Sequence, residues 1–95
     1  MEFEWDERKR RENIRKHGFD FLDVPLMFSA PMLVMPDLRY DYGEDRWIGI
    51  GMIKGRIVVV IFAERTTAAG EIVRIISLRK ALKHEREAYE QEITY

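Results

Sequence analysis

The feature that most constrains the fold is an apolar run, IVVVIFA, at residues 57–63. Five of its seven residues are β-branched, and such side chains favour the pleated surface of a sheet. The run therefore predicts a central strand. Further segments rich in apolar residues, at 32–35, 46–53 and 72–78, predict three more strands. The intervening turns are short, KG at 54–55 and TTAAG at 66–70, so neighbouring strands are expected to be antiparallel.

Three segments outside these runs predict helices. Asp6 is a suitable N-cap and Gly18 a suitable C-terminal stop, which predicts a helix over residues 7–17. Trp5 and Ile14 are the apolar residues expected to anchor it. Asp20 precedes a short apolar segment, residues 21–28, in which a proline is expected to kink or shorten the helix. Residues 79–92 have the apolar spacing of a closing helix.

The expected fold class is α+β: an antiparallel four-stranded sheet, two N-terminal helices and one C-terminal helix, with the helices on one side. A length of 95 residues predicts one domain, 1–95. The chain has no cysteine, no apolar run of about 18 residues, and no apolar core of a secretion signal near its start. The expected location is the cytoplasm.

Several kinds of site lack sequence support. There is no HExxH motif, no glycine-rich phosphate loop and no GxSxG motif. The acidic residues at 37, 41, 44 and 45 do not have the spacing of a calcium loop, so a solvated acidic loop is expected. No metal ion and no cofactor is predicted.

The stretch WDERKRRENIRKHGF, residues 5–19, holds six Lys or Arg and one His, although the net charge of the chain is only -1. A solvated helix face would explain this concentration, and so would an anion-binding surface. Lys16 and His17 fall in the last turn of the predicted helix, where cations are favoured by the helix dipole. His17 could equally serve as an acid–base group, because imidazole titrates near neutral pH. His84, among charged residues of the last helix, is expected to be solvated.

The ends of the third and fourth predicted strands carry further polar groups. Strand alternation puts Glu64 and Arg65 on opposite faces. Alternation also puts Arg74 with the aliphatic residues 72, 76 and 78, and puts Ser77 and Arg79 on the other face. Arg74 then needs solvent or a carboxylate, for which Glu64 is a possible partner.

Arginines, a lysine and a histidine on a small sheet suit a phosphodiester substrate. Arginine binds phosphate through two parallel hydrogen bonds. RNA supplies its own nucleophile, the 2′-OH, so cleavage needs a proton acceptor, cations for the developing charge, and a proton donor for the leaving 5′ oxygen. Such a reaction does not strictly need a metal ion.

Four segments in order, FEWDERKRRENIRKHGFDF, RYDYGEDRWIGIG, VVVIFAER and VRIISLRKALKHEREAYE, resemble the BrnT toxin family of type II toxin–antitoxin systems. The resemblance covers nearly the whole chain. It implies a RelE-like fold and a ribonuclease that arrests growth. It also implies a BrnA-type ribbon-helix-helix antitoxin, expected to form a heterotetramer with the toxin, and contact with operator DNA only through that antitoxin.

The resemblance also carries over site residues. Those expected to be catalytic are His17, Glu64, Arg65 and Arg79, and those expected to bind RNA are Lys16, Arg46 and Ser77. Either His17 or Glu64 would accept the 2′-OH proton. The sequence departs from the family pattern at Lys80 and Leu82, and at Pro25, which puts the geometry of the second helix in question.

Two functions remain open at this point. The first is a metal-independent endoribonuclease toxin, with Arg65 and Arg79 holding the scissile phosphate in one shared concavity with Lys16. The second is a catalytically weak relative that serves as an antitoxin-binding module in operon autoregulation.

Overall fold

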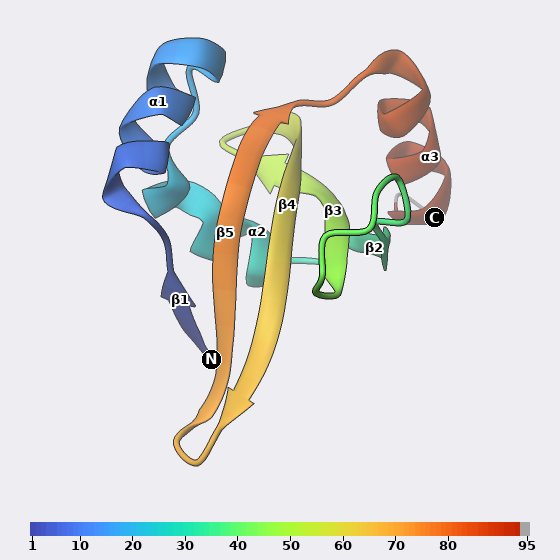
Figure 1. The fold of residues 1–95 in the computed structure, drawn as a ribbon. Coiled ribbons are helices and arrows are strands. Elements are labelled where there is room, and N and C mark those ends of the chain that lie inside the picture. Colours follow the sequence, from blue (N-terminus) through green and yellow to red (C-terminus); the bar gives the residue numbers. More distant parts are fainter. Residues whose placement is uncertain (94–95) are drawn as a thin grey trace.

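A computed structural model describes residues 1–93 of the chain and shows a five-stranded mixed sheet with the strand order β1-β5-β4-β3-β2 (Figure 1). The strands are β1 (Glu2–Glu4), β2 (Leu33–Pro36), β3 (Arg46–Ile53), β4 (Arg56–Thr67) and β5 (Gly70–Lys80). The helical elements are α1 (Glu7–His17), a 3₁₀ turn η1 (Phe21–Asp23), α2 (Val24–Phe28) and α3 (Lys83–Ile93).

The prediction of four antiparallel strands is wrong at the N-terminus. Glu2–Glu4 form β1, which pairs in parallel with β5 so that Phe3 lies opposite Val73. A strand of three residues is too short to show a period-2 pattern, so its partner must define it. The other pairings, β2 with β3, β3 with β4 and β4 with β5, are antiparallel as expected.

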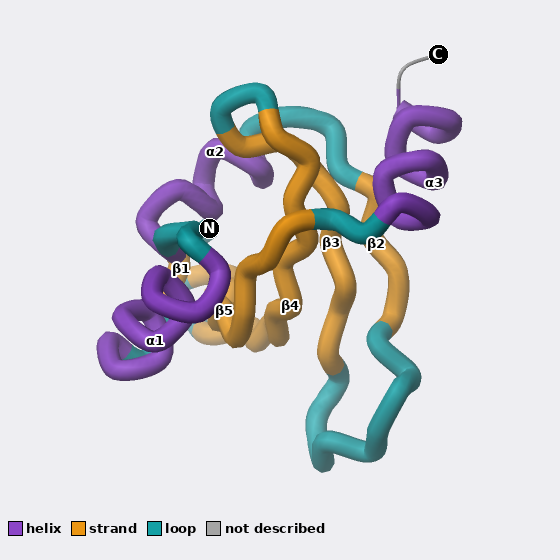
Figure 2. Tube along the Cα trace, turned by 90° about the horizontal axis from the view of Figure 1, so that it is seen from above, coloured by secondary structure: helices purple, strands orange, loops and turns teal. Residues whose placement is uncertain are grey.

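The helices do not share one side of the sheet, contrary to the prediction. Phe21, Val24 and Met27 of η1 and α2 pack on one face with Phe62 and Leu78. Tyr89 of α3 and Ala81 pack on the other face, with Ile50, Val59 and Ile61. Figure 2 shows α1 and α2 on one side of the strands and α3 on the other. The apolar run at 57–63 is therefore covered on both faces, which explains why almost every residue in it is apolar.

A β-bulge in β5 changes which side chains share a face. The register with β4 shifts between Ile61 and Phe62, which pair with Ser77 and Ile75, so that Ile76 is the extra residue. Strict alternation predicts opposite faces for Arg74 and Arg79, and this prediction is wrong. Because of the bulge, Arg74, Ser77 and Arg79 all lie on the face that α3 covers.

Asn13 attaches α1 to the edge of β5 beyond the end of β1. Its side-chain amide donates to the carbonyls of Leu78 and Phe19, at 2.8 and 2.9 Å, and its oxygen accepts from the Leu78 amide at 3.1 Å. The side chain thus replaces one residue of a neighbouring strand. Asn13 is 5% exposed, whereas Ile14, one of the two expected anchors, is 38% exposed. Trp5, the other expected anchor, packs against the core.

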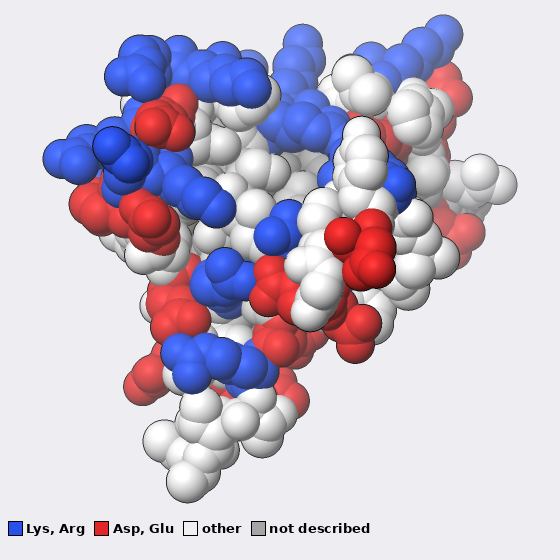
Figure 3. Space-filling view, viewed as in Figure 1, with Lys and Arg blue, Asp and Glu red and all other residues white. Residues whose placement is uncertain are grey.

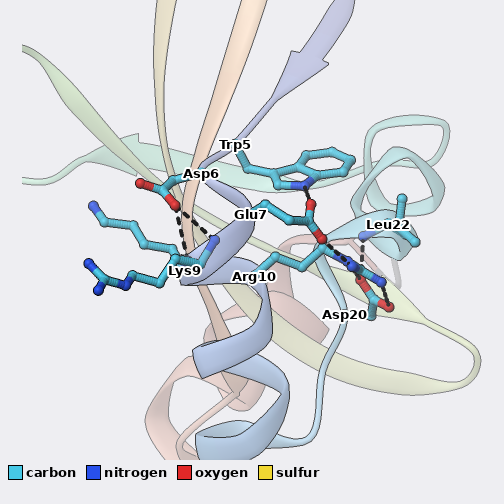
Figure 4. Close-up of polar contacts among 8 residues, drawn as sticks. Trp5, Asp6, Glu7, Lys9, Arg10, Asp20 and Leu22 are labelled. Atoms are coloured by element: carbon cyan, nitrogen blue, oxygen red, sulfur yellow. Dashed lines mark hydrogen bonds and ion pairs between the residues drawn. The ribbon is translucent and has the colours of Figure 1, made fainter.

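Some of the charged side chains at the start of α1 make hydrogen bonds and ion pairs that stabilise the fold (Figure 4). Asp6 accepts from the amides of Arg8 and Lys9, which confirms the predicted N-cap. The Arg10 guanidinium bonds Asp20 through two nitrogens, at 2.8 and 3.0 Å, and also contacts Glu7. Arg10 is therefore a structural link between α1 and the segment that begins η1. Gly18, in the left-handed conformation, ends the helix as predicted.

Candidate active site

The α3-side face of the sheet carries arginines at several levels. The turn that joins β4 and β5 is at the lower end of the sheet in Figure 1. Near this turn, Arg65 bonds Glu4 of β1 at 2.8 Å. One level higher, Arg74 and Arg46 flank Ala63 on neighbouring strands and both bond Glu44 of the β2–β3 loop. Glu44, and not Glu64, is therefore the partner of Arg74. Each of these three guanidinium groups lies beside a carboxylate, and Arg46 and Arg74 share one.

The β2–β3 loop makes more hydrogen bonds and ion pairs than we expect of a solvated acidic loop. The Asp37 side chain is fully buried, accepts two bonds from the Arg39 guanidinium and accepts one from the Tyr42 hydroxyl. These bonds, those from Arg39 above all, lower the pKa of Asp37 to about 2. The prediction of a solvated loop is thus wrong for Asp37, whereas Glu44 is exposed although it bonds two arginines.

A different group of residues lies at the upper end, where α1 and α3 stand on either side of β5 (Figure 1). Arg79 of β5 lies at this end, opposite Val59 of β4. Both of its terminal nitrogens donate to the Glu85 carboxylate of α3, at 2.8 and 2.9 Å. The bidentate pair fixes the direction of the guanidinium plane. The pair also lowers the pKa of Glu85, chiefly through the Arg79 hydrogen bonds.

His17, Lys16 and Ser77 lie beside Arg79 at this end. His17 and Lys16 from α1 and Ser77 from β5 line one shallow hollow of about 230 Å³. Partial removal from water, together with the positive charges of Lys16 and Arg79, lowers the pKa of His17. Within residues 1–93, Lys16 forms no ion pair. A neutral imidazole can abstract a proton from a hydroxyl group. The cations beside it can bind the anionic group of a substrate.

Figure 3 shows the same arrangement on the surface. Lys and Arg side chains gather along α1 and at the upper end of the sheet, and a hollowed, largely uncharged area lies between them over β5 and β4. Acidic side chains are concentrated lower on this face. The basic stretch of the sequence therefore has two uses, because Arg10 is structural while Lys16 and His17 face the hollow.

The structure does not bring all of the expected site residues together. Arg65 is six residues from Val59 along β4, which is about 20 Å at ~3.3 Å per residue. The prediction that Arg65 shares a concavity with Lys16 and Arg79 is therefore wrong. Glu64 lies near the same end as Arg65 and is exposed on the opposite face. Arg46 shares the face of Arg79 but lies about 13 Å lower, at the level of Ala63.

Some residues of this end were missed by the sequence reasoning. Arg39 and His84 line a second cavity next to Arg79, between α3 and the sheet. His84 is exposed as expected, yet it lies at this cavity. Neither residue belongs to an apolar pattern or to a recognised motif, so only the fold reveals their position.

No group of three or more His, Cys, Asp or Glu side chains within residues 1–93 could hold a metal ion.

The fold and this hollow define a small α+β protein whose cationic end suits a polyanion. A family model matches residues 5–85 and describes a ribonuclease toxin, BrnT, of a type II toxin–antitoxin system. The chain belongs to this BrnT family, as the resemblance implied, and the family implies an RNA target and an antitoxin partner.

No curated protein matches the chain. In the part of the chain that the structure describes, no helix has the length and apolar character needed to cross a bilayer. The matched residues include α1, the whole sheet apart from β1, and the first turn of α3, so they contain the candidate active site.

Proposed function

We propose that this BrnT protein is a metal-independent endoribonuclease that arrests growth in the cytoplasm, with its active site at the upper end of the sheet between α1 and α3. The observation that carries the proposal is that Lys16, His17 and Ser77, from elements about 60 residues apart, line one hollow. Arg79 lies close enough for its charge to act on His17.

Each residue has a chemical role in this proposal. His17, whose lowered pKa keeps it neutral at pH 7, accepts the proton of the 2′-OH. The 2′ oxygen then attacks phosphorus, the bond to the 5′ oxygen breaks, and the leaving 5′ oxygen takes a proton from water. Arg79 and Lys16 stabilise the negative charge that develops on the phosphate oxygens. Ser77 donates a hydrogen bond to the RNA backbone.

Arg65 and Glu64 have no part in this site because of their distance from it. Arg46 lies on the same face, where it bonds Glu44 and stacks on Tyr42, and it could contact RNA only as an outlying cation. We further propose a BrnA-type ribbon-helix-helix antitoxin that binds the toxin as a heterotetramer, covers this end, and alone contacts operator DNA.

The experiment is induced expression with and without the antitoxin, combined with cleavage of purified RNA in the presence of EDTA. The expected results are growth arrest that the antitoxin relieves, and fragments ending in a 2′,3′-cyclic phosphate whose yield EDTA does not change. A folded protein that binds the antitoxin but cleaves no RNA would instead favour the antitoxin-binding module. Cleavage that EDTA abolishes would contradict metal independence.

A further inference from the structure

A second cavity adjoins the proposed cleavage site on the α3 side of Arg79. Its volume is about 290 Å³, close to the ~300 Å³ lower limit of typical small-ligand sites. Met35, Ile48 and Ile50 of β2 and β3 form an apolar floor, and Ala88 of α3 is part of the wall. Ile50 is buried, whereas Met35 and Ile48 are half-buried, so the floor remains accessible from the cavity.

Polar groups surround this apolar floor. The Arg79 guanidinium belongs to the lining, as do Arg39 and His84. Buried Asp37 holds Arg39 through two hydrogen bonds, and Glu85 holds Arg79 in the same way, so both guanidinium groups are oriented before any ligand arrives. An apolar floor with a few fixed polar groups is the usual composition of a site for a flat heterocycle.

We infer that this cavity binds one nucleobase of the RNA, next to the scissile phosphate, and so contributes to the choice of cleavage position. The inference rests on the proposed function, because Arg79 lines this cavity and also lies close enough to His17 for its charge to act on that imidazole. Proteins recognise single-stranded RNA by taking up unstacked bases against apolar, aromatic or guanidinium surfaces. A base adjacent to a phosphate held by Arg79 would reach the Met35–Ile48 floor, with Arg39 and His84 positioned to hydrogen-bond its edge.

The test uses uncleavable 2′-O-methyl octamers, one of mixed sequence and one with every base removed. Ala88→Leu narrows the cavity from α3, and Ala68→Leu, at the exposed β4–β5 turn, makes the same change away from it. Ala88→Leu should bind the mixed octamer about tenfold more weakly than wild type, and the abasic octamer equally well. Ala68→Leu should match wild type with both. Equal weakening of both octamers by Ala88→Leu, or weakening of neither, would overturn the inference.

A measurement on the unmodified protein makes the test independent of how well the variant folds. In the NMR spectrum of methyl-labelled methionines, the mixed octamer should shift the Met35 methyl signal and the abasic octamer should not. Met27, buried on the opposite face, is the internal control. An unchanged Met35 signal with saturating mixed octamer would also refute a base in this cavity.

Failure of this inference is distinguishable from failure of the proposed function. If wild type cleaves natural RNA while Ala88→Leu cuts the same positions at the same rates, the cavity does not select a base and the ribonuclease proposal stands. If wild type cleaves nothing, the ribonuclease proposal fails whatever the octamers show.

Discussion

Both ends of one sheet face carry arginines paired with carboxylates, but the two ends differ in the residues that lie beside these pairs. At the lower end, Arg65 bonds Glu4, and Arg74 and Arg46 share Glu44. At the upper end, Lys16 has no ion pair within residues 1–93, and Arg79 is oriented by Glu85 beside a neutral imidazole. Arg79 is paired with a carboxylate as the lower arginines are, so the difference lies in Lys16 and His17, which line the hollow near it. Reactivity therefore depends on what surrounds an arginine and not on the number of arginines.

The largest expected effect is that of replacing His17. His17→Asn should reduce RNA cleavage ~10²–10⁴-fold, the usual contribution of a general base. Because the pKa of His17 is lowered, the wild-type rate should be constant near pH 7 and fall as the pH drops through that pKa, below 6.5. The neighbouring charged groups are Lys9, Glu12 and Lys16, which line the hollow, and Arg79.

The measurement is the single-turnover rate from pH 5.5 to 8 for wild type and His17→Asn. The variant should lose the acid limb of the profile as well as the rate. A wild-type rate that does not change between pH 5.5 and 8 would show that a neutral imidazole is not required.

Replacing Arg79 should have the next largest effect, and it contrasts the two ends directly. Arg79→Lys keeps a cation near Glu85 but loses the two parallel bonds, and cleavage should fall ~10²–10³-fold. Arg65→Lys, the matched change at the lower end, should stay within about twofold of wild type. Cleavage assays on both variants measure this difference, and their urea unfolding midpoints show whether the variants are folded. Equal losses for the two variants would place the reaction elsewhere.

Asn13→Ala should cost about 3 kcal/mol of unfolding free energy, because it leaves the backbone groups of Leu78 and the Phe19 carbonyl without partners. This prediction distinguishes the two ends of β5. The lower part of its edge pairs with β1, whereas the upper part is bonded to the side chain of Asn13. Urea unfolding measures the loss, and Glu12→Ala, an exposed neighbour, should change stability by less than ~0.5 kcal/mol. An Asn13→Ala cost below ~1 kcal/mol would mean that other contacts hold α1.

The smallest effect is expected at Glu44. Glu44→Gln weakens exposed bonds to Arg74 and Arg46 and should cost no more than ~1 kcal/mol, a cost that shrinks as salt is added. The cleavage rate should not change measurably in low salt. A large loss of stability that persists in high salt would show that this network is more than an exposed ion pair.

The local pattern of the sequence predicted most elements. The helix at 7–17 and the strand at 46–53 are confirmed at both ends, because a cap, a glycine stop and apolar runs mark them. The strand at 57–63 extends to Arg56–Thr67, since the polar ERTT segment continues the hairpin beyond the apolar core. The closing helix begins later than expected, at Lys83.

The missing parts depend on contacts between distant residues. β1 forms because Glu2–Glu4 pair with β5, where Phe3 lies opposite Val73. Arg74 and Arg79 share a face because of the bulge at Ile76. His17 reaches Arg79 only because Asn13, four residues earlier in α1, bonds Leu78, 65 residues away. Period-2 and period-3.6 patterns carry no information about such contacts, so the residue types of the site were predictable and their grouping was not.

The most direct test of the account is an amide chemical-shift titration of the protein with the uncleavable 2′-O-methyl octamer of mixed sequence. The account predicts the largest shifts at residues 13–18 and 76–85, around His17 and Arg79, and small shifts at residues 63–72. If instead the largest shifts fall around Arg65, at the lower end, RNA does not bind where we place it.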